Sequence, residues 1–534
     1  MRSLPRGTLN AIKRGLVVLL TFLVINFYWR DHHPSGSSSS SVSGFESSLN
    51  GQDAEGHGGL PYPLPRTRLL RNSIPLTQIL NHAPGYTVFR DLYFHKGIYL
   101  ILTDSPHEIP KNLDHIAFIE NRPVEVPKPV EMLEVRREPI IGNFPKGMIH
   151  DAFITPEEAV KRFDVGKVQV VKGISFVNND KKFSTIVYHW IGEAFTGAWR
   201  VYTNLFTKNS IPLQAIPDPD RFIFMHVDDH MFDYEDLSTW EGGWRDRQGL
   251  NLWYTKKLFP NAVIETLEDW EDRMNSDTIY RFETVILADR FGGHAGPTSS
   301  YKPWGDAFRL DVPKNWFQPL RERLLADYKG PIPVERTKEG APKTKLPVIT
   351  YITRQTTTRR LTDESHDDLM KELDRIRKEK LAEVNVEEFE ERSVEDQIAI
   401  MGRTSILISV HGNGLTNALW MNPGPHSGVF EFQPNWCRFN DFGPLAEGNG
   451  IPHWIVNADT MCAPAECGIR GCIDPENPVV NSDHIEIDAS FVAKQVRSIL
   501  ATGKPDYVPA RANPLYPEEE PGMWPGTPGW KGGR

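Results

Sequence analysis

The stretch that most constrains the fold is residues 406–433, which read as a strand, a tight glycine loop, a short helix and a second strand. Residues 406–410 are almost entirely apolar, as is typical of a short strand buried on both faces of a parallel sheet. The segment His411-Gly412-Asn413-Gly414 ends this strand, and a helix is predicted over 415–420. Because Asn-Pro-Gly-Pro follows at 422–425, the helix is expected to be short.

The glycine loop predicts an anion site. A helix that begins directly after a glycine turn points its unpaired backbone N–H groups and the positive end of its dipole into the crevice above the preceding strand. Such a crevice readily takes a phosphate or pyrophosphate. We therefore expect the backbone N–H groups of residues 414–416 to face a phosphorylated ligand.

A second candidate element is the arginine loop of residues 350–361, TYITRQTTTRRL. Arg354 directly follows the predicted strand 347–353, which places it at the carboxyl edge of the sheet, and Arg359 and Arg360 follow in the same loop. Planar, permanently charged guanidinium groups suit diphosphate oxygens. We expect Arg354, with Arg360, to form a metal-free diphosphate cradle with the glycine loop. A solvated basic turn is the alternative for Arg359 and Arg360.

The hydrophobic pattern predicts an α/β fold in two domains, each Rossmann-like. The first half contains predicted strands at 97–103, 167–177, 221–227 and 282–288 and predicted helices at 182–206, 249–259 and 316–328. The second half contains predicted strands at 347–353, 383–389 and 406–410 and helices at 362–380, 394–401 (with Ser393 as N-cap) and 488–500. This alternation indicates a doubly wound parallel sheet, whose ligands bind at the carboxyl ends of the strands.

The N-terminus predicts a membrane anchor. Residues 1–14 are basic, and residues 15–29 (GLVVLLTFLVINFYW) are uncharged. The run is shorter than the roughly 20 residues that span a bilayer comfortably, but its aromatic end suits a membrane interface. A cleaved signal peptide is the alternative, although the small-residue cleavage site is missing. We expect a cytosolic tail, a single-pass anchor at 15–29 and a Ser/Gly-rich flexible stem at 30–65.

Composition shifts set the remaining predicted boundaries. The first α/β domain is expected at 66–330, a Pro/Gly-rich linker at 331–346, the second α/β domain at 347–503 and a disordered tail at 504–534. The net charge of −10 argues against a general nucleic-acid surface.

Four cysteines, Cys437, Cys462, Cys467 and Cys472, lie within the last quarter of the chain. An even number in one cluster predicts two disulfides, for which three connectivities are open. A zinc site is the alternative, but no CxxC spacing supports it.

The segments TRQTTTRRL and SVEDQIAIMGRTSILISVHGNGLTNALWMNPGPHSGVFEFQP resemble the catalytic domain of glycosyltransferase family 61. The matching residues are Arg354, His411, Gly412, Gly414, Leu415, Thr416, Asn417 and Glu431. The stretch IVYHWIGEAFTGAWRVY resembles the family's Tyr/Phe-His helix, with His189 and Glu193. The resemblance covers residues 183–434, and the insertion HVDDHMFDYEDLSTWEGGWRDRQ departs from it.

The resemblance implies an inverting transfer from a UDP-sugar by a GT-B-like enzyme, with xylose or N-acetylglucosamine as the donor sugar and a glycan or glycoprotein hydroxyl as the acceptor. No cofactor or metal is implied. The matching residues of the second domain, together with Arg359 and Arg360, would bind the donor, and Glu431 would accept hydrogen bonds from the ribose or the base. The predicted anchor then implies a type II protein of the Golgi or endoplasmic reticulum, with a luminal catalytic domain.

Inversion needs a base that removes the proton of the acceptor hydroxyl. His189 and Glu193 are four residues apart on a predicted helix, so they share a face and suit a base and its orienting partner. A structural pair that pins the helix is the alternative. Asp228, Asp229 and His230 follow the strand at 221–227, and Asp229 is the second candidate for the base.

Two other functions use the same residues. His226, Asp228, Asp229 and His230 could bind a divalent metal in a metal-dependent enzyme, although no distant third ligand is evident. A catalytically inactive glycan-binding module of the same fold is the second alternative. A dehydrogenase is disfavoured, because the full GxGxxG motif is missing and the glycine loop comes late in its domain.

Overall fold

The computed structural model describes residues 74–95, 98–104, 116, 153–162, 168–180, 184–227, 243–246, 248–294, 302–326, 346–435, 437–463, 466, 471–472 and 482–507. The predicted tail, anchor and stem at 1–65 lie outside these residues, as do most of the predicted linker and the C-terminal tail. Within the described ranges, no helix combines the length and the apolar character needed to cross a membrane.

The first half of the described chain forms a mixed sheet. Its order is β4 (Phe153–Ile154), β3 (Ile98–Leu102), β2 (Tyr86–His95), β8 (Ile279–Ala288), β5 (Val168–Asn178), β6 (Arg221–Phe224) and β7 (Val263–Glu265), and β1 (Gln78–Ala83) pairs with β2. Strands β8, β5, β6 and β7 run parallel, as the prediction of a Rossmann-like domain requires. Strand β3 was predicted at 97–103, but β1 and β2 were not, and the sheet is mixed because β2 runs antiparallel to β8.

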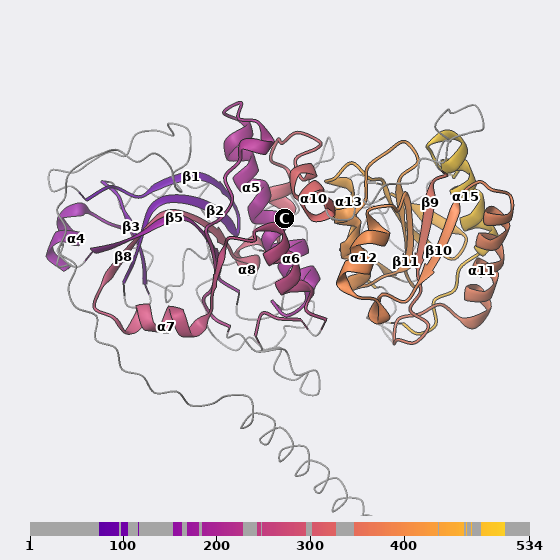
Figure 1. Cartoon of the computed structure of the whole chain (residues 1–534), viewed down its shortest axis with the longest axis horizontal. Coiled ribbons are helices and arrows are strands. Elements are labelled where there is room, and N and C mark those ends of the chain that lie inside the picture. The colour runs from indigo at the N-terminus through magenta and orange to yellow at the C-terminus, as the bar shows by residue number, and fades with distance from the viewer. Residues whose placement is uncertain are drawn as a thin grey trace, which may run out of the picture. The chain divides into compact units, whose positions relative to one another are not determined.

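Helices cover both faces of this sheet, since successive strand residues point to opposite sides. Phe176, Phe222 and Ile286 pack with η3 (Tyr188–Phe195), α5 (Thr196–Thr207), α6 (Leu250–Leu258) and α10 (Gln318–Leu325). Val177 and Leu287 pack on the other face, with α7 (Leu267–Asn275) (Figure 1). The remaining short helices of this half are α4 (Pro156–Arg162), η4 (Leu213–Ala215), α8 (Arg290–His294) and α9 (Gly305–Phe308).

The helix predicted over 182–206 differs in kind from the expectation. It begins as a π-helix, η3, and continues without a gap as α5. The Thr196 backbone N–H donates to the Ile191 carbonyl, five residues back, whereas in a regular α-helix it would donate to the carbonyl four residues back. Short π-helical turns are frequent at functional sites.

The second sheet confirms the doubly wound prediction. Its order is β10 (Glu383–Glu387), β9 (Val348–Ile352), β11 (Ile406–Val410), β12 (Gly428–Phe432), β14 (His453–Asn457) and β15 (Thr460–Cys462). The first five run parallel, and β15 is antiparallel. In chain order the parallel strands read 2-1-3-4-5, so the order reverses between β9 and β11.

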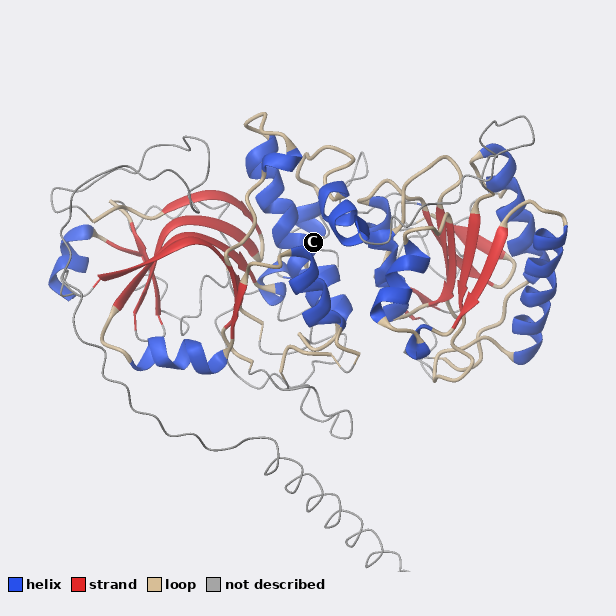
Figure 2. Cartoon of the chain, in the orientation of Figure 1, coloured by secondary structure: helices blue, strands red, loops and turns tan. Residues whose placement is uncertain are grey.

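Helices also lie on both sides of this second sheet (Figure 2). Helices α11 (Asp363–Lys378) and α15 (Ala489–Thr502) pack on one face, and α12 (Val394–Met401) and η7 (Asn413–Trp420) on the other. Ser393 caps α12 as predicted, and it accepts from the Asp396 N–H at 3.1 Å. The short elements η6 (Phe389–Glu391), β13 (Cys437–Arg438), α13 (Gly443–Glu447) and β16 (Gly471–Cys472) complete the described part.

The two sheets share one hydrophobic core. Trp190 and Leu324 of the first half belong to the same buried cluster as Leu415 and Trp420 of the second half. The Tyr254 hydroxyl also accepts from the Trp420 indole N–H at 3.1 Å. The glycine-loop helix is therefore packed against the first half of the chain.

Cys437 and Cys462 are both disulfide-bonded in the structure. Cys437 lies opposite Cys472 in the register of β13 and β16. Because Cys467 lies outside the described residues, the predicted pair of disulfides stays a prediction.

Candidate functional site

The candidate site lies where the strand order of the second sheet reverses. Strand β9 ends at Ile352, shortly before Arg354, and the parallel strand β11 ends at Val410, directly before His411. Parallel neighbours end at the same edge of a sheet, and the crevice at such a reversal is the usual ligand position in doubly wound folds. The structure thus brings the arginine loop and the glycine loop together, as the sequence predicts.

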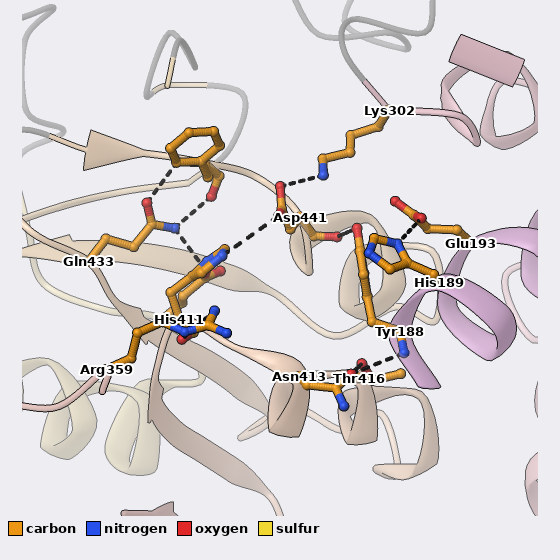
Figure 3. A network of polar contacts seen from close by, with 12 residues as sticks. Tyr188, His189, Glu193, Lys302, Arg359, His411, Asn413, Thr416, Gln433 and Asp441 are labelled. Carbon is orange, nitrogen blue, oxygen red and sulfur yellow. Dashed lines mark hydrogen bonds and ion pairs between the residues drawn. The ribbon is translucent and has the colours of Figure 1, made fainter. Parts of the chain in front are cut away.

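The Arg354 guanidinium packs directly against the backbone of Gly412. Gly412 has φ +156°, and a Cβ added there would lie 1.9 Å from Arg354 Nη1 and 3.5 Å from Arg359 Nη1. Arg359 Nη1 also donates to the His411 carbonyl at 3.4 Å, as Figure 3 illustrates for His411 and Arg359. The missing side chain of Gly412 is what allows two guanidinium groups to meet at one turn.

Among the described residues, the carboxylates near the two arginines are distant or already paired: Glu390 is far from Arg354, and Asp441 and Glu431, which act on Arg359, contact Lys302 and two histidines. The Arg354 side chain is only 13% exposed, its buried Nε has no hydrogen-bond partner, and its nearest carboxylate, Glu390, lies 3.8 Å away. Burial lowers the pKa of Arg354, and burial together with repulsion from Arg354 lowers the pKa of Arg359 to about 10. Such a cluster favours an anion, because an anion would supply the acceptors and charge that the protein does not.

The two neighbouring arginines, Arg359 and Arg360, have different surroundings in the structure. The sequence prediction favoured Arg360 as the partner of Arg354, but the Arg360 side chain is 41% exposed and lies 3.7 Å from Asp483. Its backbone pairs with the segment before α15, through bonds to Ser482 and Ile485. Arg359, in contrast, contacts the His411 carbonyl beside Gly412, and the role of either arginine in donor binding stays a prediction.

A buried polar chain holds His411 from behind. His411 Nδ1 contacts Glu431 Oε1, and the other oxygen of Glu431 lies 2.7 Å from His453 Nε2. Gln433 donates to Glu431 Oε1 at 2.8 Å. Burial raises the pKa of the Glu431 carboxyl, but its bonds to His411 and His453 outweigh burial and lower that pKa to about 2.

Glu431 therefore differs from the expectation that it contacts the nucleotide. Its side chain is fully buried, and both of its oxygens are occupied by protein donors. A carboxylate held in this way fixes the ring of His411, whose backbone forms the start of the glycine turn. This geometry suits a positioning role for Glu431, and its contact with the nucleotide stays a prediction.

The glycine-loop motif is buried more than expected. Residues 413–420 form a 3-10 helix, and the Leu415 N–H donates to the Gly412 carbonyl at 2.9 Å. Leu415 lies in the core, and Asn417 accepts from the Tyr254 hydroxyl at 2.9 Å. Gly414 lies 3.6 Å from Ile352, measured from an added Cβ. Leu415 and Asn417 thus join the two halves of the chain, and only Asn413 and Gly414 of this motif are partly exposed.

His189 and Glu193 form the predicted pair on η3. His189 Nδ1 lies 2.6 Å from Glu193 Oε2, and the His189 side chain is 24% exposed. Arg290, which was not predicted, donates to the same oxygen from Nε at 2.7 Å and lies 2.9 Å from His189 Nδ1 through Nη2. Nδ1 donates to the ionised Glu193 in the tautomer that leaves the lone pair on Nε2, whereas in the other tautomer Nδ1 accepts from Arg290 Nη2.

Electrostatics favour a neutral His189 beside an ionised Glu193. Burial raises the pKa of Glu193, but the charge of Arg290 and the contacts with His189 outweigh it and lower that pKa well below its usual value. Burial and the charge of Arg290 lower the pKa of His189, against the opposing effect of Glu193. A neutral imidazole with its tautomer fixed by a carboxylate is suited to accept a proton.

Asp441 and Lys302 connect the His189 and His411 regions, and sequence reasoning missed both. The Asp441 carboxylate lies 2.8 Å from Lys302 Nζ and 3.7 Å from His411 Nε2 (Figure 3). The Tyr188 hydroxyl donates to the Asp441 carbonyl at 2.8 Å. One feature of the sequence could have pointed to Asp441. It follows β12 in the chain, and the carboxyl end of that strand lies at the same sheet edge as Arg354 and His411.

The second candidate base and the alternative metal cluster lie largely outside the described residues. Asp228, Asp229 and His230 are not described, and His226 Nε2 lies 3.0 Å from Asn179 Oδ1. The described part of the chain contains no group of three or more metal-binding side chains. The metal-dependent alternative is therefore untested.

The structure places a buried arginine pair at the strand-order reversal of a doubly wound sheet, and a histidine–carboxylate pair on η3. Residues 188–429 match the family described as Glycosyltransferase 61, which confirms the predicted resemblance. The chain therefore carries a glycosyltransferase family 61 domain, which implies a transferase enzyme. The matched span begins at Tyr188, next to His189, and ends two residues before Glu431. No curated protein matches the chain.

Substitution of Gly412 by alanine is expected to weaken anion binding at this site. The new Cβ would overlap Arg354 Nη1, so the guanidinium must move away from the turn. We expect UDP affinity to fall by about tenfold or more, since displaced guanidinium bonds are among the stronger polar contacts. Calorimetric titration with UDP measures this, and Gly424→Ala, where the nearest atom is 3.4 Å away, is the control. Unchanged affinity in Gly412→Ala would contradict the assignment of the turn.

Proposed function

We propose that the protein is an inverting, GT-B-like glycosyltransferase that moves a sugar from a UDP donor to a hydroxyl group of a glycan or glycoprotein. The observation that carries this proposal is the pair of largely buried arginines, Arg354 and Arg359, packed on the Gly412 turn at the reversal of the second sheet. A diphosphate is the anion whose size and charge suit two adjacent guanidinium groups.

The proposed reaction is a single displacement. His189 Nε2 takes the proton of the acceptor hydroxyl as its oxygen attacks the anomeric carbon from the face opposite UDP. The bond between the anomeric carbon and the diphosphate oxygen breaks, and UDP leaves with the electron pair. Arg354 and Arg359 stabilise the charge that develops on the leaving diphosphate. Glu193 holds His189 in the tautomer that can accept the proton.

Sequence features support the rest of the proposal. The basic residues 1–14 and the uncharged run 15–29 support a type II anchor in the Golgi or endoplasmic reticulum, with the described residues in the lumen. The family resemblance favours xylose or N-acetylglucosamine as the transferred sugar. We propose a reaction that needs no metal and no other cofactor, because the Arg354 and Arg359 guanidinium groups can supply the positive charge that a leaving diphosphate needs.

The test is a donor screen on the chain from about residue 60 onward. Several UDP-sugars, UDP-xylose and UDP-N-acetylglucosamine among them, are tested for binding and slow hydrolysis in EDTA and in manganese. Turnover of one donor in EDTA is the expected result and identifies the sugar. Activity that requires manganese would contradict the metal-free reaction and direct attention to residues 226–230. Binding without turnover, even with glycan acceptors present, would instead favour an inactive glycan-binding module.

A further inference from the structure

Asn413 occupies the centre of the Gly412-Asn413-Gly414 turn, but its side chain bonds to the other half of the chain. Asn413 Oδ1 accepts a hydrogen bond from the backbone N–H of Tyr188 at 3.0 Å. Tyr188 is the first residue of η3, the helix that carries His189 and Glu193. The two bonded residues are 225 positions apart in the sequence. The contact therefore joins the arginine-bound turn directly to the start of the helix of the proposed base (Figure 3).

This contact has the chemistry of a helix cap. The first N–H groups of a helix have no acceptor within the helix, and an Asn, Asp, Ser or Thr side chain next to the start usually supplies one. The residue in the capping position of η3 is Val187, whose side chain makes no such bond. Asn413 supplies the acceptor instead, from the glycine turn of the second sheet.

Tyr188 is held at a second point by the same half of the chain. Its hydroxyl donates to the Asp441 carbonyl at 2.8 Å, and its ring lies 4.7 Å from that of Phe442 between centroids. A Cβ added at Gly192, one turn further along η3, would lie 3.5 Å from Thr416 Cγ2. The first turn of η3 is therefore held in place by contacts with the glycine turn and with the residues near Asp441.

We propose that Asn413 is a positioning residue that couples the donor turn to the base: it fixes the start of η3 so that His189 lies correctly over the donor held at Gly412. This inference rests on the proposed function, since it takes His189 as the base and the Gly412 turn as the donor site. Asn413 acts through Tyr188 and η3, so its loss changes the rate of the chemical step more than the affinity for the nucleotide.

The test compares Asn413→Ala with Asn413→Asp in the full chain. Alanine removes the acceptor oxygen, whereas aspartate keeps an oxygen at the same reach. We expect Asn413→Ala to lower kcat for UDP-sugar hydrolysis by about ten- to a hundredfold, the scale of small misplacements of a catalytic group. Its Kd for UDP should stay within about threefold of the wild-type value. At saturating donor, Asn413→Asp should recover most of the lost kcat.

The matched control is Asp488→Ala. Asp488 caps α15 by accepting from the Phe491 N–H at 3.0 Å, on the sheet face away from η7. This variant loses a cap of the same kind without a link to η3, so its kcat should not change. Equal losses of UDP affinity and kcat in Asn413→Ala would make Asn413 a simple donor contact and overturn the proposal. An unchanged kcat in Asn413→Ala would also overturn it. Failure of the wild-type chain to bind or turn over any UDP-sugar would instead refute the proposed function.

Discussion

Arg354→Ala is expected to abolish measurable UDP binding while the protein stays folded. A guanidinium that binds a diphosphate makes two charge-assisted hydrogen bonds, each contributing roughly 1.5–3 kcal/mol. Their loss corresponds to a decrease in affinity of about a hundredfold or more. Folding should be little affected, because the buried Nε of Arg354 has no hydrogen-bond partner and its ion pair with Glu390 is long, at 3.8 Å. Titration calorimetry with UDP and a thermal unfolding curve measure the two effects separately.

Arg360→Ala provides the matched control for Arg354→Ala. It removes the same charge from the same loop, but its side chain pairs with Asp483 and is partly exposed. We expect its UDP affinity to stay within about threefold of the wild-type value, with a larger difference at low salt, where screening is weakest. If Arg354→Ala bound UDP with wild-type affinity, or if Arg360→Ala lost as much UDP affinity as Arg354→Ala, the Gly412 turn would not be the donor site.

The second sheet could be predicted from the sequence because its signals are local. Apolar runs such as 406–410 fill buried strands, and Ser393 caps the helix it was expected to cap. Strand β2 was missed because its pattern is interrupted. Asp91, in its middle, has φ +54° and is absent from the register with β8, where Arg90 pairs with Thr284 and Leu92 with Phe282. The register with β8 is the same on both sides of Asp91, so β2 continues unbroken through a charged residue with positive φ, and this residue interrupts the apolar pattern that would have indicated the strand.

The candidate site could be predicted only as far as its sheet edge. Strand order places Arg354 and His411 at the same edge, and any doubly wound sheet would do so. The choice between Arg359 and Arg360 depends on a backbone contact with residues 482–485, over a hundred positions later. Lys302, Asp441 and Arg290 were missed for a similar reason. Their partners are distant in the sequence, and no spacing rule links them.

His189→Ala is expected to lower kcat by about a hundred- to ten-thousandfold, the usual contribution of a general base. UDP affinity should be unchanged, since the diphosphate is held by the other half of the chain. The wild-type enzyme should lose activity as the pH falls through the pKa of His189, because only the neutral ring accepts a proton. Burial and Arg290 lower this pKa below its usual 6.5, so activity should persist to pH values somewhat below 6.5.

Glu193→Gln separates the role of the base from that of its partner. The negative charge of Glu193 raises the pKa of His189, so its removal should move the acid limb of the kcat profile to lower pH. The rate at the plateau should also fall, because an amide no longer fixes the Nε2 lone pair toward the acceptor. If His189 and Glu193 only stabilise the helix, Glu193→Gln should lower stability but change neither the acid limb nor the plateau rate. If His189→Ala kept a kcat within threefold of the wild-type value, the base would have to come from elsewhere, and Asp229 in the segment after β6 would be the residue to replace next.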